Sequence, residues 1–400
     1  MIKRHLQAVL KDSARMFPVI TLTGPRQSGK TTLARATFTK AHYVSLEDPA
    51  QRTLALDDSK GFLSQFGTEQ VILDEAQRAP DLFSYIQVVV DENDIPGQYI
   101  LTGSQNFLLM EKISQSLAGR CAIHHLLPFS RLELIGAKPI DPENITSLPR
   151  LHRKKQTIPE LFNILWTGGY PRIHDKHIPP QQWLANYIQT YIERDVRSIE
   201  NVSDLETFTR FVRLCAGRTG QILNLQSLGN DCGIDGKTTK RWLSILETSF
   251  VIKLLRPYNK NFSKRLIKSP KLYFLDSGLL CYLLGIRKPD ELMVHSSRGA
   301  IFESWVISEL YKSYYHTGRQ PAMYYLRDSN NNEIDLVIEH GPKIVPIEIK
   351  SGQTINSEFF KGLEYWRRVT GQADCPAALI YGGDTPNVYK NIKIIPWYML

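Results

Sequence analysis

Short apolar segments separated by polar or amphipathic stretches dominate the first hundred residues. Four of them have the length and composition of buried strands: Val19–Thr23, Tyr43–Leu46, Val71–Leu73 and Tyr99–Thr102. Strands that are apolar on both faces are typical of parallel sheets covered by helices, because each face packs against a helical layer. This pattern predicts an α/β domain with a parallel sheet over residues 1–136.

The middle of the chain is predicted to be mostly helical. A stretch containing Pro and Lys, Ala137–Pro159, interrupts the first pattern, so we expect a linker or lid region over residues 137–185. Apolar residues at helical spacing predict a helix over Asn186–Cys215. Further on, two expected helices at Gln226–Asp231 and Lys237–Glu247 flank a glycine-containing turn. That arrangement is typical of a helix-turn-helix.

Two more strands are expected after the helix-turn-helix. They are Phe250–Pro257 and Lys271–Leu275, on either side of a basic loop, Asn259–Ser269. A helix-turn-helix followed by such a pair is the arrangement of a winged helix, so we expect a helical and winged-helix domain over residues 186–290. A second α/β pattern occupies residues 291–400 and is expected to form the C-terminal domain.

The composition is that of an ordinary globular protein, with 42% hydrophobic and 22% charged residues. No apolar run approaches the roughly 18 residues of a transmembrane helix, and the N-terminus lacks the apolar region of a signal peptide. The five cysteines form no CxxC or Cys/His pattern, which argues against a structural zinc site. We therefore expect a cytoplasmic protein with no membrane partner.

The basic residues are concentrated in one part of a chain whose net charge is +9. Between Lys237 and Lys271 there are ten Lys or Arg residues and one acid, Glu247. Because this run coincides with the predicted helix-turn-helix, we expect contacts with nucleic acid, and with DNA in particular. The residues expected to make these contacts are Lys237, Lys240, Arg241, Lys264, Arg265 and Lys268. The alternatives are a solvated basic face, a rigid lid or a protein-interaction module.

A phosphate-binding motif follows the first predicted strand. The motif GxxxxGK[ST] is matched by Gly24-Pro25-Arg26-Gln27-Ser28-Gly29-Lys30-Thr31, and Thr32 begins the next helix. In this setting the glycines let the loop N–H groups point at the phosphate, and the helix N-terminus adds partial positive charge. We expect Lys30 to bridge the β- and γ-phosphates and Thr31 to bind Mg²⁺. The motif predicts that the chain binds ATP.

The third predicted strand ends in two acids, as in a Walker B motif: Val71-Ile72-Leu73-Asp74-Glu75. We expect Asp74 to hold Mg²⁺ through water and Glu75 to orient and deprotonate the attacking water. The alternative is a strand that ends in a solvated turn. Its position downstream of a phosphate loop favours the Walker B interpretation and predicts ATP hydrolysis.

Two further residues are candidates for the ATPase site. Ser104 follows the fourth strand and is expected to sense the γ-phosphate or the water, with Thr102 as the second candidate. Arg120 is expected to act as an arginine finger or, equally, to form a structural salt bridge.

Acids and a lysine recur in the C-terminal α/β pattern. Residues two apart on a strand share a face, so Glu348 and Lys350 are expected to project together from one strand. If the preceding strand pairs with it, Asp335 lies close to both. Two carboxylates can hold Mg²⁺, and a neighbouring lysine can position and polarise the attacking water.

A fourth residue is a candidate for this site. Glu303 lies on the apolar face of the predicted helix Gly299–Tyr311, where an acid needs a partner. Glu309 lies within the same broad arc, so the choice of Glu303 is not unique. The alternative for all four residues is that they are surface charges.

The Walker motifs resemble the AAA superfamily of ATPases. The whole chain is similar to bacterial ATPases of that superfamily fused to a winged helix and a PD-(D/E)xK restriction-endonuclease-like domain. The resemblance rests on Gly24–Thr31, Leu73-Asp74-Glu75, Thr102-Gly103-Ser104, Gly119-Arg120, Glu193-Arg194-Asp195, Lys268–Lys271, Asp276-Ser277-Gly278 and Asp335…Glu348-Ile349-Lys350.

This resemblance implies roles for the C-terminal residues. Asp335 and Glu348 would bind the metal, Lys350 would be the catalytic lysine and Glu303 the accessory acid. The twelve-residue separation of Asp335 and Glu348 gives no clue to the substrate. The resemblance is equally compatible with a nuclease-like domain that only binds DNA.

Together these features predict an ATP-hydrolysing, Mg²⁺-dependent protein that binds DNA and carries a candidate nuclease site. The first alternative is a non-cleaving ATP-driven switch or remodeller that binds DNA. The second is an ATPase signalling module whose winged helix contacts protein. The sequence leaves the oligomeric state open, including a homo-oligomer.

Overall fold

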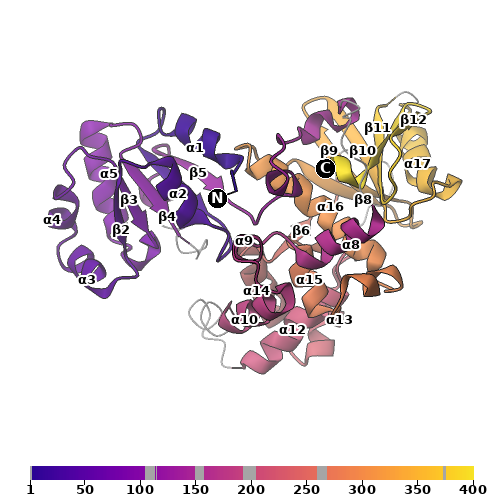
Figure 1. The fold of residues 1–400 in the computed structure, drawn as a ribbon, viewed down its shortest axis with the longest axis horizontal. Helices are drawn as coiled ribbons and strands as arrows, with labels where there is room; N and C mark the ends of the chain where they lie inside the picture. Colours follow the sequence, from indigo (N-terminus) through magenta and orange to yellow (C-terminus); the bar gives the residue numbers. More distant parts are fainter. Residues whose placement is uncertain are drawn as a thin grey trace. The chain divides into compact units, whose positions relative to one another are not determined.

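The computed structural model describes residues 2–103, 113, 115–148, 157–191, 204–258, 268–372 and 375–400. The chain divides into two compact units, both drawn in Figure 1. Unit 1 comprises residues 1–138, 248–250 and 315–319, and unit 2 comprises residues 139–247, 251–314 and 320–400.

Unit 1 is built around a five-stranded parallel sheet with the order β2-β3-β4-β1-β5. The strands are β1 (Val19–Thr23), β2 (His42–Ser45), β3 (Val71–Asp74), β4 (Tyr99–Thr102) and β5 (Cys121–His125). The first four confirm the predicted strands to within one residue at either end. The fifth strand is one that the apolar pattern does not predict.

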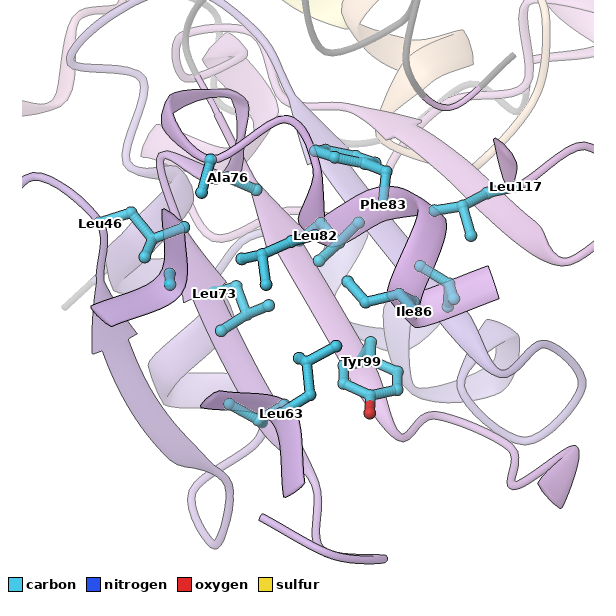
Figure 2. Close-up of a cluster of buried hydrophobic side chains, with 14 of the residues drawn as sticks. Leu46, Leu63, Leu73, Ala76, Leu82, Phe83, Ile86, Tyr99 and Leu117 are labelled. Carbon is cyan, nitrogen blue, oxygen red and sulfur yellow. The ribbon is translucent and has the colours of Figure 1, made fainter. Parts of the chain in front are cut away.

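Helices pack on both faces of this sheet. They are α1 (Leu6–Ser13), α2 (Lys30–Thr37), α3 (Pro49–Asp57), α4 (Ser59–Ser64), α5 (Leu82–Asn93) and α7 (Arg131–Leu134), with a 3₁₀ turn at Ala76–Arg78. Leu73 and Tyr99 point into one core with Ile86 of α5 (Figure 2). Their neighbour Ile72 points into the opposite core with Leu33 of α2. This alternation places a buried core on both faces, as a helix-covered parallel sheet requires.

The first part of unit 2 is helical. Its helices are α8 (Ile158–Thr167), α9 (Pro171–Asp175), α10 (Pro180–Tyr191), α12 (Leu205–Gly217), α13 (Leu225–Cys232), α14 (Gly236–Thr248) and α15 (Ser277–Leu283), with 3₁₀ turns at Pro142–Ser147 and Pro289–Met293. Helices α8 and α9 occupy much of the range expected to be a linker or lid. Because α8 packs against α15, this stretch is part of a helical body and not a bare connection.

Helices α13 and α14 confirm the two predicted helices of the helix-turn-helix. Gly233 ends α13 with a φ of +76°, a conformation that suits glycine, and the Asp235 side chain accepts hydrogen bonds from the first turn of α14. Trp242 of α14 packs edge-on against Phe208 and Phe211 of α12, with ring centroids 5.1 and 5.3 Å away. The predicted strands also occur, as the antiparallel pair β6 (Ile252–Leu255) and β7 (Lys271–Phe274).

The remainder of unit 2 contains a six-stranded mixed sheet with the order β12-β13-β11-β10-β9-β8. Its strands are β8 (Met323–Arg327), β9 (Glu333–His340), β10 (Lys343–Lys350), β11 (Ala377–Tyr381), β12 (Asn387–Tyr389) and β13 (Ile392–Pro396). Helices α16 (Arg298–Tyr315) and α17 (Lys361–Thr370) accompany it, with 3₁₀ turns at Ser357–Phe360 and Trp397–Met399. The antiparallel pairing of β9 with β10 confirms the pairing on which the C-terminal site depends.

In the described parts of the chain, no helix is both long enough and apolar enough to span a membrane.

Candidate functional site

The phosphate loop connects β1 to α2 and has a backbone that depends on its glycines. Gly24 has a φ of +146°, and a Cβ at this position would lie 2.2 Å from the carbonyl oxygen of Leu126 on the neighbouring segment. Gly29 has a φ of +92° at the N-cap of α2. Both conformations exclude ordinary side chains, so the loop geometry follows directly from the motif.

Lys30 places its ammonium group inside this loop. Its Nζ donates to the carbonyl oxygens of Gly24 at 3.0 Å and Pro25 at 2.8 Å, and the side chain is buried. Phosphate oxygens are stronger acceptors for a buried ammonium than neutral carbonyls are. The structure therefore places Lys30 where the sequence predicts it, beside the position that phosphates would take.

Thr31 and Asp74, the two predicted ligands of Mg²⁺, are in direct contact. The Thr31 hydroxyl donates to Asp74 Oδ2 at 3.0 Å and lies 3.1 Å from Oδ1. Because β3 and β1 both flank β4 in a parallel sheet, the end of β3 and the start of the phosphate loop meet at the same edge. A hydroxyl and a carboxylate are the hard oxygen ligands that Mg²⁺ prefers, so these residues fit the ion.

Two further hydroxyls bind the same carboxylate. Tyr43 Oη donates to Asp74 Oδ2 at 2.9 Å, and the Thr102 hydroxyl donates to Asp74 Oδ1. Burial and the proximity of Asp74 raise the pKa of Tyr43, which keeps the phenol protonated as a donor. The sequence named Thr102 only as a second candidate and did not name Tyr43. Ser104, the first candidate, lies outside the described residues.

Glu75 follows β3 immediately and has a φ of +56°, which is uncommon for a residue other than glycine. Its Oε2 accepts a hydrogen bond of 2.5 Å from the side-chain amide of Gln77. This amide orients the carboxylate at the edge of the sheet where Asp74 ends. The position is consistent with the predicted role in activating water.

Arg120 lies far from the phosphate loop of its own unit. It precedes β5, which pairs in parallel with β1 in the register Val19↔Cys121, so Arg120 lies at the amino end of β1. The phosphate loop follows the other end of that strand, roughly 16 Å away at about 3.3 Å per residue. Arg120 instead forms an ion pair with Asp91 of α5, with Nη2 2.8 Å from Oδ2. The structure thus matches the alternative of a structural salt bridge.

The C-terminal candidates Asp335, Glu348 and Lys350 come together as predicted. Lys350 Nζ lies 3.0 Å from Asp335 Oδ2 and 2.6 Å from Glu348 Oε1. The backbone N–H of Ile349 also donates to Asp335 Oδ2, at 2.8 Å. The two carboxylates are buried, whereas the Lys350 side chain is 31% exposed and can be reached from solvent.

Glu303 joins the same group of acids from α16. Its Oε1 accepts a hydrogen bond of 2.5 Å from Tyr273 Oη, and Lys271 Nζ lies 3.4 Å away. Glu309, the other acid considered on this helix, instead pairs with Lys312 at 2.8 Å. The structure therefore distinguishes the two glutamates in favour of Glu303.

Lys271 belongs to the basic run that is expected on the surface, but the structure places it in the interior. Its side chain is 3% exposed and pairs with Glu303 and with Glu333, a second acid that the sequence argument did not single out. Tyr273, from the same strand β7, was also missed. These residues are separated from Glu303 and Glu333 by 30 to 62 positions, so only the fold reveals the contacts.

Glu303, Glu333, Asp335 and Glu348 form a carboxylate cluster, in which Glu303 and Glu348 have raised pKa values. Burial raises the pKa of Glu348, and Asp335 adds to the effect, to about 8. Burial likewise raises the pKa of Glu303, against the opposing charge of Lys271. For Lys350, burial opposes the charge, but Asp335 and Glu348 outweigh it and raise the pKa. Added positive charge would stabilise this cluster.

The fit of Mg²⁺ to the cluster rests on the carboxylates. Glu348 Oε2 is buried and has no hydrogen-bond partner, which leaves one strong acceptor free for a cation. Within the described ranges, however, no three His, Cys, Asp or Glu residues are arranged around one metal position. The assignment of Asp335 and Glu348 as metal ligands therefore stays a proposal, based on two carboxylates.

The predicted DNA-binding residues lie on the surface where the structure describes them. Lys237, Lys240 and Arg241 on α14 are exposed, and so is Lys268. Lys264 and Arg265 lie outside the described residues, as do Glu193, Arg194 and Asp195.

Three family models match successive parts of the chain. Residues 16–135 match a family described as AAA domain. Residues 158–290 match a domain of unknown function (DUF8612), and residues 298–400 match a second domain of unknown function (DUF4143).

Similar proteins occur in Mycobacterium tuberculosis and Haemophilus influenzae. An uncharacterized protein of Mycobacterium tuberculosis is 29% identical over 357 residues, which cover 88% of this chain and 74% of the relative. An uncharacterized protein of Haemophilus influenzae is 22% identical over 192 residues, 46% of each chain.

Among solved structures, the Walker-type ATPase of Pyrococcus abyssi shares 14% identity and a TM-score of 0.41, covering 71% of this chain and 96% of the other. The RuvB Holliday junction branch migration motor of Thermotoga maritima shares 16% identity and a TM-score of 0.27, covering 62% and 87%. Unit 1 is thus a P-loop ATPase-like α/β domain by the geometry of its phosphate loop and Asp74, and its residues 16–135 match the family described as AAA domain.

Proposed function

We propose that the chain hydrolyses ATP to ADP and phosphate in unit 1. The observation that carries this proposal is the contact between Thr31 and Asp74 beside the buried ammonium of Lys30. The arrangement combines a cation for the phosphates with oxygen ligands for Mg²⁺. The family match over residues 16–135 supports the same activity.

Each residue has a defined part in this hydrolysis. Lys30 binds the β- and γ-phosphate oxygens and neutralises charge that builds up on them. Thr31 and Asp74 would hold Mg²⁺, which would supply positive charge to stabilise the phosphate oxygens. Glu75, held by Gln77, orients a water molecule in line with the γ-phosphate and accepts its proton. Tyr43 and Thr102 keep the Asp74 carboxylate in place.

Two substitutions separate binding from turnover. Lys30→Ala removes the buried cation, so we expect ATP affinity measured by calorimetry to fall by an order of magnitude or more. Glu75→Gln keeps the shape but not the base, so we expect ATP binding to persist while phosphate release drops by about 10²- to 10⁴-fold.

Lys40→Ala is the matched control, because Lys40 is an exposed lysine of the same unit. It should leave both properties unchanged. Normal ATP binding by the Lys30→Ala protein would contradict the proposal, and so would native phosphate release by the Glu75→Gln protein.

As a second function, we propose that unit 2 binds DNA and hydrolyses its phosphodiester bonds. The favouring observation is that Asp335, Glu348 and Lys350 meet at one point with an unpartnered Glu348 oxygen. We interpret α13, α14, β6 and β7 as a winged helix whose exposed residues Lys237, Lys240 and Arg241 contact phosphates. Electrostatic contacts of this kind weaken as salt rises because bound counterions are released.

The carboxylates and the lysine divide the chemistry of cleavage. Asp335 and Glu348 would hold Mg²⁺, which would supply charge stabilisation at the scissile phosphate. Lys350 is partly exposed, so its ammonium can position the attacking water and meet the phosphate. Glu303, bound to Lys271 and Tyr273, supports the cluster from α16.

Cleavage and binding are tested with supercoiled, branched and single-stranded DNA, with Mg²⁺ or Mn²⁺, with and without ATP. We expect Lys350→Ala to remove cleavage while folding, ATP hydrolysis and duplex binding persist. Replacing Lys237, Lys240 and Arg241 by Ala should weaken duplex binding and reduce its salt slope by about one unit per lost contact.

The outcomes distinguish the alternative functions. Cleavage by the Lys350→Ala protein at the native rate would indicate a contaminant. Binding without cleavage under all conditions would favour a non-cleaving ATP-driven switch. A native salt slope near zero would favour a protein partner for α14.

A further inference from the structure

A cavity of about 450 Å³ lies in unit 2 near the carboxylate cluster but with a different lining. It is formed where the segment after β6, the segment before β7 and strand β8 meet. The residues that matter for its chemistry are Arg256, Pro257, Tyr258, Lys268, Pro270 and Tyr324.

Backbone pairing holds the walls of the cavity in place. The N–H of Tyr258 donates to the carbonyl oxygen of Tyr325 at 2.7 Å. The N–H of Tyr325 donates to the carbonyl oxygen of Arg256 at 3.1 Å. The segment after β6 therefore runs along β8 as an added strand, with a parallel bridge between Pro257 and Tyr325. The cavity walls are consequently fixed by the fold.

Two consecutive tyrosines of β8, Tyr324 and Tyr325, point to different sites. Neighbouring side chains of a strand point to opposite faces. Tyr325 lies toward Lys271 of the carboxylate cluster, with the ammonium 5.6 Å from its ring. Tyr324 lines the cavity instead and packs edge-on against Tyr258, with ring centroids 5.7 Å apart. The cavity and the carboxylate cluster are thus on opposite sides of one strand.

The cations of the cavity contrast with the lysine of the cluster. Lys271 is buried and paired with two acids. Arg256 and Lys268 are exposed, and neither side chain forms an ion pair or hydrogen bond with a described residue. One acid, Glu339, also lines the cavity, so its lining carries a net charge of +1. Two free cations beside an aromatic ring suit a ligand that has both a flat ring and a negative charge.

We propose that this cavity binds one nucleotide unit of single-stranded nucleic acid. The base packs against Tyr324 and the prolines, and the adjoining phosphates contact Arg256 and Lys268. Aromatic stacking combined with a basic track is how proteins hold single strands without reading sequence. The inference rests on the proposed action on DNA and specifies that unit 2 binds DNA in its single-stranded form.

Spacing along the chain supports a connection between cavity and cluster. Lys268 and Lys271 are three residues apart, a span of at most about 10 Å. Successive phosphates of one strand are about 3.4 Å apart along the axis of a duplex, and farther apart in an extended strand. The span between Lys268 and Lys271 is therefore that of a few nucleotides.

The test uses a fluorescein-labelled oligothymidylate and the full chain, without divalent metal, and follows binding by anisotropy. Tyr324→Ala should weaken binding of the oligonucleotide roughly 5- to 150-fold, the range for loss of one stacked base. Tyr324→Phe should bind like the native protein, because stacking needs the ring and not the hydroxyl. Arg256→Gln with Lys268→Gln should weaken binding and reduce its salt slope by about 1.4 units, because each phosphate contact with a single strand contributes about 0.7.

Two matched controls belong to the same unit. Tyr389→Ala removes another partly exposed tyrosine, and Lys288→Ala removes an exposed lysine with no ion pair among the described residues. Both should bind the oligonucleotide like the native protein. Native-like binding by Tyr324→Ala would overturn the proposal. Equal weakening by Lys288→Ala would also overturn it, because it would show nonspecific attraction to the basic surface.

The source of the ligand and the link to the proposed function are tested separately. If thymidine monophosphate binds as tightly as the oligonucleotide and Tyr324→Ala weakens both equally, the site takes free nucleotides and the single-strand proposal fails. The variant lacking Lys237, Lys240 and Arg241 should lose duplex binding but keep single-strand binding. If the native protein binds the single strand but neither cleaves DNA nor binds duplex, the proposed function fails and the assignment of the cavity stands.

Discussion

Arg4 is a buried guanidinium that ties the phosphate loop to the rest of unit 1. Its Nη1 donates to the carbonyl oxygen of Ser28 at 2.9 Å, and its Nε lies 3.0 Å from Glu133 Oε1. His316 lies on the other oxygen of Glu133 at 3.3 Å. Burial alone would raise the pKa of Glu133, but His316 and Arg4 lower it well below its ordinary value. Glu133 is therefore a buried anion whose charge depends on its partners.

We expect Arg4→Met to lower the free energy of unfolding by about 3–5 kcal/mol, because it leaves the Glu133 charge buried without one of its two charged partners. It should also weaken ATP binding, since the Ser28 carbonyl loses its anchor. Urea unfolding measures the first effect and calorimetry the second. Lys3→Met is the control, because Lys3 is exposed and adjacent. Equal stability of the two variants would contradict the expectation.

The same network predicts a pH dependence in a known direction. The folded-state pKa of Glu133 lies below its unfolded value of about 4.5. Its contribution to stability is thus complete at pH values above 4.5 and is lost as the pH falls toward the folded-state pKa. The difference in stability between the native and Arg4→Met proteins should accordingly shrink on acidification.

At the level of residues, motifs with a local cause were predicted and long-range partners were not. Lys30, Thr31 and Asp74 were identified because a glycine-rich loop and an apolar strand fix their neighbours. The sequence places Lys271 in a basic run, because its partners Glu303 and Glu333 are 32 and 62 positions away and no local pattern indicates them. Tyr43 was likewise missed, since its partner Asp74 is 31 positions away.

At the level of elements, strands that are apolar on both faces were predicted, and β5 was not. Its sequence, Cys121 to His125, contains two histidines and does not look like a buried strand. The fold gives both side chains contacts: His124 is within 2.9 Å of the Ser13 hydroxyl, and the ring of His125 packs against Phe250 and Tyr315. Burial lowers the pKa of His124 to about 4, so it is neutral in the core at physiological pH.

The prolines at the start of unit 2 predict a linker, whereas the structure has helices there. Pro159, Pro171 and Pro180 each lie in the first turn of a helix, where the missing N–H costs nothing. Thr157 and Glu160 form a capping box at the start of α8. A proline is as typical of the first turn of a helix as it is of a linker. Only the apolar pattern of the residues that follow distinguishes a helix from a linker.

At the level of the whole molecule, the division into units does not follow the order of the chain. Residues 248–250 and 315–319 belong to unit 1, although they follow the helices of unit 2. His316, which directly follows α16, belongs to the Glu133 network of unit 1. Contiguous domain boundaries drawn on the sequence cannot represent such an exchange.

The two units predict separate responses to ligand in thermal unfolding. ATP with Mg²⁺ binds only native unit 1, so it should raise the midpoint of the transition that belongs to that unit. The gain is about 2.7 kcal/mol when free ATP is a hundred times its dissociation constant. Unit 2 has its own core and should unfold at an unchanged midpoint.

Differential scanning calorimetry of the full chain measures both transitions. Lys30→Ala should abolish the ATP-dependent shift, whereas Lys350→Ala should retain it, because Lys350 belongs to unit 2. Tryptophan fluorescence assigns the transitions, since all six tryptophans of the chain, including Trp242 and Trp366, lie in unit 2. A single transition that ATP shifts as a whole would show that the units unfold cooperatively. That result would contradict their independence while leaving ATP binding in place.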